Sequence, residues 1–276
     1  MKKLFTLLAL TITFSMNAQV STNSTSPTGI YASAMGNGTT ASGNESTAMG
    51  YDTTASGEAS TAMGYSTTAS AQGSTAMGKL TTASNTASTA MGYQTTASGD
   101  YSTAMGNSST AMGNSSTAMG RNTRASGLYS TAMGYDTTAS DYASLVIGQY
   151  NSSGSSATNA VSFSTSNTAF VIGNGTASNA KSDAFKVMFN GDATVSNDLT
   201  VSGDVVISSD ARLKSNIVSL GSTLPKLLQI DGKSYEMKGK QKIGVLAQEI
   251  QELFPELVSE DDNEMLSVNY QGFVPV

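Results

Sequence analysis

The sequence predicts a mainly β fold, in which a parallel β-solenoid, or β-roll, of 14-residue coils leads through a β-stalk into a small α+β domain. Three observations predict it: a short repeat of fixed period, a composition with little charge and no Cys, Trp or His, and a rise in charge density near the C-terminus. A fixed short period means that one small structural unit is stacked many times.

The repeat is built around the tripeptide Ala-Met-Gly. Its methionines recur every fourteen residues, at Met35, Met49, Met63, Met77, Met91, Met105, Met119 and Met133. Ile147 takes the next position, so nine coils are expected. Met112 occupies a half-coil position that serine holds in most other coils. Fourteen residues are too few for a helix pair but suffice for two short strands and two turns.

Side chains alternate between the two faces of a strand, which assigns the residues of each coil to an inside and an outside. In the segment 46–50, Thr and Met point to one face, and Ser, Ala and Gly to the other. Leu145 and Ile147 replace Thr and Met together. We therefore predict that the methionine face lies inside the coil and that the small-residue face packs against another chain. Nine coils, stacked at about 4.8 Å, would form a thin body roughly 40 Å long.

Residues 1–18 are predicted to be a secretory signal peptide, because Lys2 and Lys3 precede the apolar run Leu4–Phe14 and a small-residue cleavage site ends at Ala18. Its removal changes the formal net charge from −6 to −8, so nucleic-acid binding has no electrostatic support. No later segment approaches the ~20 apolar residues of a transmembrane helix. We expect a secreted or cell-surface protein, exported in the Gram-negative manner. Because the sequence lacks Cys and His, we expect no metal site and no cofactor.

The mature chain is expected to have four parts. A linker, 19–30, precedes the head repeats, 31–150. A transition and β-stalk follow over 151–208, and the chain ends in a domain over 209–276. That last quarter holds 7 of the 14 Lys and Arg residues and 10 of the 20 Asp and Glu residues, which marks it as a separate domain.

Short strands and helices are expected beyond the head. Phe170–Gly173 looks like a last copy of the repeat, and apolar residues of one parity over 195–207 predict half-buried stalk strands. Such a ribbon buries its apolar edge only by wrapping with identical chains. In the terminal domain we expect a helix over 220–228, a strand and helix over 242–254 ended by proline, and a strand over 266–270.

Two family resemblances cover the chain from about residue 31 onward. Ser209–Ile217, Ile243–Glu249 and Val268–Tyr270 occur in order and resemble the intramolecular chaperone auto-processing domain of phage endosialidase tail spikes and related fibres. The repeats resemble the left-handed β-roll head of YadA-like trimeric adhesins. Together these resemblances imply a homotrimer whose terminal domain aligns the chains and helps the preceding β-fibre to wind in register.

The endosialidase-type resemblance also implies self-cleavage before the serine of an SDxRxK motif. Carried over, the scissile bond is Ser208–Ser209, the nucleophile is Ser209 and the base is Lys214, with Asp210 and Arg212 in support. A serine hydroxyl needs a neighbouring proton acceptor, and a lysine amine is a candidate in a chain without histidine. The amine must be neutral, so we expect it to be buried beside Arg212 or another cation. The enzyme activity would be at most that of a single-turnover serine endopeptidase, acting within one chain or between chains.

Two features leave alternatives open in the terminal domain. Ser209 and Asp210 could instead cap a helix, with Lys214 solvated on its first turns. The resembling domains usually continue past the tyrosine-containing strand into a long helix, whereas this sequence ends at Val276. That difference predicts either a truncated domain or a trimer held by other elements.

For the head, the first hypothesis is an adhesin that presents its turns to an unidentified surface receptor or glycan. Charged side chains that vary from coil to coil at the turns would determine which receptor is bound. Alternatively, they are only solvated loop charges. These residues are Asp52, Glu58, Lys79, Arg121 and Arg124. An alternative is an ice- or surface-binding solenoid, because hydroxyls recur at one position: Thr39, Thr53, Thr67, Thr81, Thr95, Ser109, Thr123 and Thr137. A further alternative is a phage-derived tail fibre without cleavage. The repeats hold no recurrent carboxylate pair of the kind that glycosidases use.

Overall fold

The computed structural model describes residues 22–261 and 264–273. The predicted signal peptide, 1–18, lies outside the described residues. The chain divides into two compact units, and the boundary falls between Thr200 and Val201.

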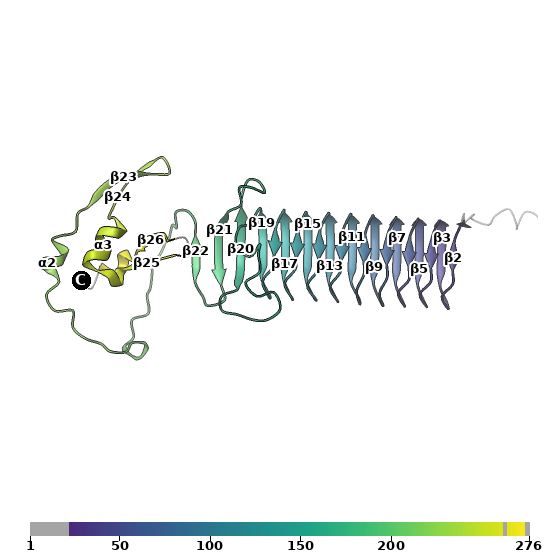
Figure 1. Cartoon of the computed structure of the whole chain (residues 1–276), viewed down its shortest axis with the longest axis horizontal. Coiled ribbons are helices and arrows are strands. Elements are labelled where there is room, and N and C mark those ends of the chain that lie inside the picture. Colours follow the sequence, from purple (N-terminus) through teal and green to yellow (C-terminus); the bar gives the residue numbers. More distant parts are fainter. Residues whose placement is uncertain (1–21, 262–263, 274–276) are drawn as a thin grey trace, which may run out of the picture. The chain divides into compact units, whose positions relative to one another are not determined.

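The first unit contains the predicted β-solenoid (Figure 1). Each coil contributes a long strand, and these strands are β3 (Ser33–Asn37), β5 (Thr47–Tyr51), β7 (Thr61–Tyr65), β9 (Thr75–Lys79), β11 (Thr89–Tyr93), β13 (Thr103–Asn107), β15 (Thr117–Arg121), β17 (Thr131–Tyr135) and β19 (Leu145–Gln149). Short strands form the opposite sheet: β2 (Ser26–Pro27), β4 (Thr40–Ala41), β6 (Thr54–Ala55), β8 (Thr68–Ala69), β10 (Thr82–Ala83), β12 (Thr96–Ala97), β14 (Thr110–Ala111), β16 (Arg124–Ala125) and β18 (Thr138–Ala139). Equivalent strands pair in parallel, so that Met49 lies opposite Met63. The nine predicted coils are confirmed.

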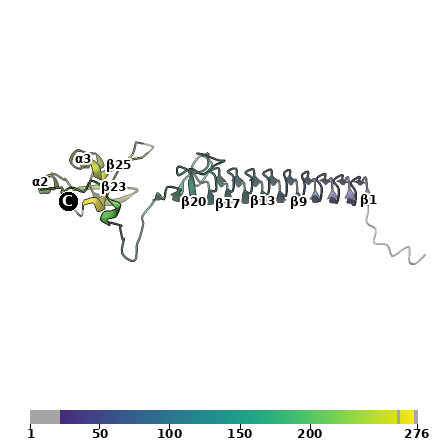
Figure 2. The same cartoon turned by 90° about the horizontal axis from the view of Figure 1, so that it is seen from below.

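The long-strand sheet continues past the ninth coil. β20 (Thr168–Asn174) pairs in parallel with β19, and Ile172 lies opposite Ile147. This confirms the interpretation of the segment around Phe170 as a last copy of the repeat. β21 (Asp183–Met188) and β22 (Ala193–Val195) then add antiparallel strands, while β1 (Thr22–Asn23) pairs with β3 at the other end. Figure 2 shows the coils stacked along the solenoid.

Alanine builds the interior of the solenoid. Ala48 from a long strand and Ala55 from a short strand are fully buried, and so are the other alanines of this seven-residue series from Ala41 to Ala139. Buried serines at a second interior position use their hydroxyls locally; Ser46 Oγ donates to the carbonyl of Gly43 at 2.6 Å. The small size of these buried side chains shows that the two sheets of the solenoid lie close together. The core is therefore thin, and its stability depends on close packing of many small side chains.

The methionine face lies on the outside, so our prediction that it fills the coil was wrong. In β5 the exposure alternates: Thr47 and Met49 are half-buried, whereas Ala48 between them is fully buried. Met35 and Met133, near the two ends, keep 37% of their surface exposed. The physical reason is the narrow interior, which holds Ala at most of these positions and Val at Val146 and Val171, but no side chain as long as Met. The apolar Thr/Met row is therefore available for lateral packing.

The threonine ladder considered for ice binding lies inside the coil. Thr39, Thr53, Thr67, Thr81, Thr95 and Thr137 are completely buried, and their hydroxyls have no hydrogen-bond partner among the described residues. Thr123 donates to Ser109 at 2.9 Å, also in the interior. These hydroxyls cannot reach an ice surface, so the ice-binding alternative based on this ladder is wrong.

Glycine is required at the fourth position of every long strand. Gly78 has a φ of +116°, and a Cβ there would overlap the backbone carbonyl of Gly92 in the next coil. L-residues with side chains rarely adopt this φ. The equivalent residues from Gly36 to Gly148 are all glycines of similar φ.

A polar cap closes the C-terminal end of the solenoid. The carboxylate of Asp141, fully buried, accepts hydrogen bonds from the backbone N–H groups of Thr158 (2.6 Å) and Thr168 (2.8 Å). Asp183 similarly accepts from the N–H groups of Ser152 and Ser153, both at 2.8 Å. The loop between β19 and β20 is thereby held across the last coil, whose edge would otherwise present unpaired backbone groups.

The predicted stalk strands form only as far as Val195. The described residues 196–210 contain no strand, and Leu199 and Ile207 are 71% and 60% exposed. A ribbon of this kind needs a partner to cover its apolar edge, and a single chain supplies none there. The expectation of strands over 196–207 is therefore wrong for the isolated chain.

In its described residues, the second unit holds two hairpins, two short α-helices and three 3-10 turns, with a small core. The hairpins are β23 (Lys233–Met237) with β24 (Lys240–Gly244), and β25 (Val258–Glu260) with β26 (Leu266–Val268). The helices are α2 (Leu224–Leu227) and α3 (Ala247–Leu253), with the 3-10 turns η1 (Ala211–Leu213), η2 (Pro255–Leu257) and η3 (Tyr270–Phe273). Ile250, Phe254 and Leu257 are its buried centre. The predicted helix over 220–228 is thus much shorter, and Tyr270, expected in a strand, lies in η3.

Candidate functional site

The candidate site is formed where the extended chain turns into η1. Asp210 is the N-cap of this turn, and its carboxylate accepts a hydrogen bond from the Arg212 backbone N–H at 2.8 Å. The same carboxylate pairs with the Arg212 guanidinium, with an N–O distance of 2.7 Å. The capping interpretation is therefore correct for Asp210, but it applies to a 3-10 turn, not an α-helix.

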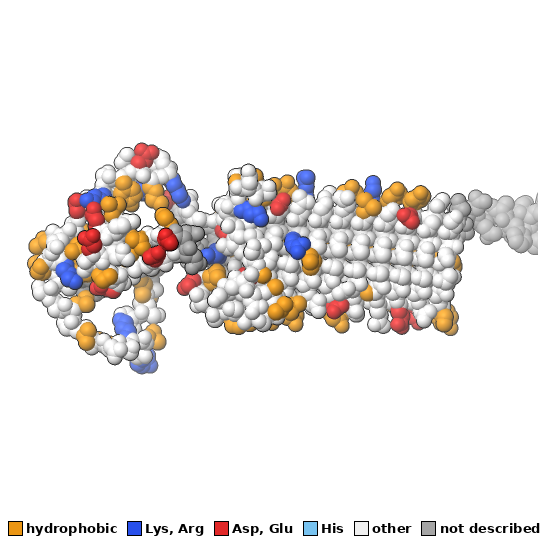
Figure 3. Space-filling model, viewed as in Figure 1, with side chains coloured by type: hydrophobic (Ala, Val, Ile, Leu, Met, Phe, Trp, Pro, Cys, Tyr) orange, Lys and Arg blue, Asp and Glu red, His pale blue; other side chains and the backbone are white. Residues whose placement is uncertain are grey.

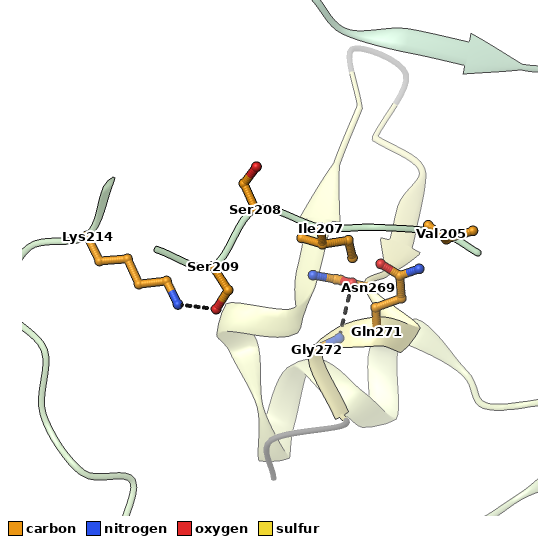
Figure 4. Close-up of a pocket in the computed structure, with 8 residues that line it drawn as sticks. All are labelled: Val205, Ile207, Ser208, Ser209, Lys214, Asn269, Gln271 and Gly272. Carbon is orange, nitrogen blue, oxygen red and sulfur yellow. Dashed lines mark hydrogen bonds between the residues drawn. The ribbon is translucent and has the colours of Figure 1, made fainter. Parts of the chain in front are cut away.

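The turn brings the two predicted dyad residues together. Lys214 Nζ lies 2.7 Å from Ser209 Oγ, within hydrogen-bond distance (Figure 4). Lys214 is the C-cap of η1, and its backbone N–H bonds to the carbonyl of Ala211. A five-residue separation in the sequence thus becomes a direct contact because a single capped turn folds the lysine back over the serine. The catalytic roles of both residues stay a prediction.

Two expectations for the surroundings of Lys214 differ from the structure. The lysine side chain is exposed, and Arg212 turns to Asp210. Arg212 therefore stabilises the turn through its ion pair with Asp210 and does not pair with the Lys214 amine. Nothing among the described residues encloses the dyad, so they do not supply the burial that we expected for the amine.

An open pocket of about 680 Å³ adjoins the dyad. Figure 4 shows its lining, which the extended segment and η1 share with the start of η3. The lining residues are Val205, Ile207, Ser208, Ser209, Lys214, Asn269, Gln271 and Gly272. Asn269 and Gln271 were not predicted from the sequence. The signal for Asn269 was that it belongs to a segment shared with the endosialidase-type domain.

The Asp210–Arg212 pair predicts a titration that can be measured. The side-chain and backbone hydrogen bonds from Arg212 hold the pKa of Asp210 below its ordinary value of 3.8. A carboxyl whose pKa is lowered on folding stabilises the turn fully above its unfolded pKa, and this contribution is lost as the pH falls through the folded pKa. In the Ser209→Ala chain, the Asp210 carboxyl carbon should titrate below pH 3.8 by NMR. Arg212→Ala should return the midpoint toward the ordinary value; a midpoint unaffected by this substitution would contradict the pairing.

The variable charged residues of the head are all exposed, at Asp52, Glu58, Lys79, Arg121 and Arg124. On the face in Figure 3, charged and large apolar side chains gather along the edges of the solenoid. One edge is an aromatic and cationic row: the rings of Tyr51 and Tyr65 stack at 5.0 Å, Lys79 Nζ lies 5.4 Å from the Tyr65 ring, and Arg121 lies 5.3 Å from Tyr135. Lys79 and Arg121 thus have cation–π partners within the same chain, so a receptor is not needed to explain these two charges.

No helix within the described ranges is long and apolar enough to cross a bilayer. The same residues contain no group of three or more Asp or Glu side chains placed to hold a metal ion.

Comparison with known families agrees with both resemblances. The YadA head domain repeat matches five overlapping or adjacent stretches, 28–53, 55–81, 83–109, 111–137 and 125–151, and each stretch spans about two coils. The chaperone of endosialidase matches residues 209–259, which begin at the candidate nucleophile. No curated protein matches the chain. The chain therefore carries a head of YadA-type repeats followed by a segment of the endosialidase chaperone family.

Proposed function

We propose that this chain is an exported homotrimeric fibre with an adhesin-like head, and that its terminal domain aligns the three chains and then releases itself by cutting between Ser208 and Ser209. The observation that carries the cleavage is the 2.7 Å contact between Ser209 Oγ and Lys214 Nζ at the start of the chaperone match. The match to YadA head repeats supports an adhesin role and a homotrimer, because YadA-type adhesins are homotrimers. The match to the chaperone of endosialidase supports the chaperone role of the terminal domain.

Trimer formation is favoured by the outer face of the solenoid. The Thr/Met row runs along every coil, and at its ends a methionine keeps 37% of its surface exposed. Fully burying such a side chain contributes about 1.5–3 kcal/mol, so covering the remaining third adds about 0.5–1 kcal/mol per methionine. The other six methionines of the row are half-buried, so each adds a smaller gain of the same kind, and these gains accumulate along the row.

Apolar residues around the cleavage segment also need a partner. Val206, Leu213, Ile217 and Val218 are each between 67% and 89% exposed. Exposed apolar surface of this extent marks an interaction site. Identical segments from two further chains would cover it and would enclose Lys214 at the same time. Cleavage would then follow assembly, because only the assembled trimer provides the buried environment that a neutral lysine requires.

The chemistry uses the residues of the turn and one water molecule. Lys214 takes the hydroxyl proton of Ser209, and Ser209 Oγ attacks the carbonyl carbon of Ser208. The tetrahedral intermediate breaks the bond to the Ser209 nitrogen, which receives the proton from Lys214, and leaves an ester between Ser208 and Ser209 Oγ. Water hydrolyses this ester to give the Ser208 carboxylate and a released fragment with Ser209 at its N-terminus.

Light scattering combined with intact-mass analysis tests this function. At micromolar concentration, the full-length protein should have the mass of three chains, and a fragment beginning at Ser209 should appear after the trimer has formed. Refolding from denaturant over a range of concentrations should slow both events together on dilution. A well-folded monomer, or cleavage at a rate independent of protein concentration, would contradict the proposal.

A further inference from the structure

Asn269 shares the pocket with the predicted scissile bond, although it lies far from it in the sequence. It precedes η3, and it lines the same open space as Ser208 and Ser209 (Figure 4). Its backbone N–H donates to the carbonyl of Leu257 at 2.8 Å, and Leu257 belongs to the buried centre of this unit. The position of Asn269 is thereby fixed by the hydrophobic core of the unit.

The orientation of the Asn269 amide is fixed as well. Its Oδ1 accepts a hydrogen bond from the backbone N–H of Gly272 at 3.2 Å. The oxygen end of the amide is thus turned to η3. Its two N–H donors form no hydrogen bond within the described residues, which leaves them for another acceptor. In Figure 4 the nitrogen end points toward the chain between Ile207 and Ser209.

The cleavage reaction needs a hydrogen-bond donor at this place. Attack of Ser209 Oγ turns the Ser208 carbonyl oxygen into an oxyanion, and fixed donors directed at such an oxygen are among the largest contributions to acyl-transfer catalysis. Lys214 is occupied with the proton of Ser209, and the Gly272 N–H is taken by Asn269 itself. The side-chain amide of Asn269 is the donor in the pocket whose position and direction are both held.

Helix capping alone does not account for the choice of asparagine. At an N-cap, Asp and Ser serve as well as Asn, because the helix needs only an acceptor oxygen. An oxyanion needs the N–H donors, which Asp lacks. The two roles of Asn269 can therefore be separated by substitution.

We propose that Asn269 is a catalytic residue of the self-cleavage, and that its side-chain amide donates a hydrogen bond to the oxyanion that forms on the Ser208 carbonyl oxygen. This inference rests on the proposed function of the Ser209–Lys214 dyad.

The test compares cleavage rates of full-length variants after refolding, with trimer mass measured by light scattering in each case. Asn269→Asp keeps the cap and removes the donors, so cleavage should slow by about 100-fold or more while the trimer mass is unchanged. Asn269→Ser also keeps the cap, and its hydroxyl ends one bond short of the amide nitrogen, so the reaction should slow as well. This variant replaces the first one if that one does not assemble. Gln271→Ala tests the other amide of the pocket, and Gln229→Ala, a change at an exposed glutamine outside the pocket, should stay within about threefold of the wild type.

The outcomes separate this inference from the function on which it rests. If the wild-type chain cleaves and Asn269→Asp cleaves within about threefold of it, Asn269 is only a helix cap and the inference is overturned. If Gln271→Ala is the slow variant and Asn269→Asp is not, the donor is assigned to the wrong amide. If the assembled wild-type trimer does not cleave, or if Ser209→Ala still cleaves, the proposed function fails and the role of Asn269 fails with it.

Discussion

Replacing Ser209 by Ala should abolish the fragment that begins at residue 209. The substitution removes one oxygen atom, and with it the only nucleophile that the turn presents to Lys214 at 2.7 Å. Loss of a nucleophile in Ser-based acyl transfer typically lowers the rate by more than about 10³-fold. Intact-mass analysis of refolded protein after a fixed time should show the full-length mass alone.

Ser208→Ala is the matched control. Ser208 contributes its backbone carbonyl to the scissile bond, and alanine supplies the same carbonyl, so this variant should cleave at nearly the wild-type rate. Lys214→Met should behave as Ser209→Ala, because methionine is of similar length and cannot accept a proton. Appearance of the fragment in Ser209→Ala, or its loss in Ser208→Ala alone, would place the nucleophile elsewhere.

Replacing Gly78 by Ala should destabilise the solenoid by about 3 kcal/mol. The new Cβ would overlap the carbonyl of Gly92, and the residue would have to hold a φ of +116°. The overlap is with backbone of the next coil, which cannot move without disturbing the ladder on both sides. Urea unfolding of the uncleavable Ser209→Ala chain, at one fixed protein concentration, measures the change in the free energy of unfolding.

Gly73→Ala provides the comparison within the same protein. The atom nearest to a Cβ at Gly73 would be the Cα of Ala87, at 3.9 Å, so the next coil leaves room for a methyl group. Gly73 has a φ of +63°, but alanine occupies the equivalent positions at Ala59 and Ala87 with φ of +53° and +50°. We expect a loss within about 1 kcal/mol. Equal losses for Gly73→Ala and Gly78→Ala would show that the strand glycines are not special.

The period of the repeat was enough to predict the solenoid, because a strict register leaves few other ways to stack fourteen residues. It also predicted the last copy in β20, where Ile172 lies opposite Ile147. The period does not say which face is inside. Our assignment depended on strict alternation and on the apolar character of Leu145 and Ile147. The width of the coil decides instead, and it admits small side chains such as Ala but not Met.

The candidate site was predictable in part for a similar reason. A short motif carries Ser209, Asp210, Arg212 and Lys214, and one capped turn is enough to bring the serine and lysine together. The position of the Arg212 guanidinium could not be predicted. Whether it pairs with the Asp210 carboxylate or lies beside Lys214 depends on the local backbone geometry. Asn269 reaches the pocket through the core of the second unit, and such long-range placement leaves no trace in local sequence.

The interchangeable coils have a genetic consequence. Neighbouring coils share the same strand partners and the same buried alanines, and the polar cap at Asp141 lies at one end of the stack. Unequal recombination between the corresponding near-identical stretches of the gene would insert or delete whole coils while leaving both ends of the head intact. Natural variants of this head are therefore expected to differ in length by multiples of fourteen residues, which would alter how far its tip projects from the rest of the fibre.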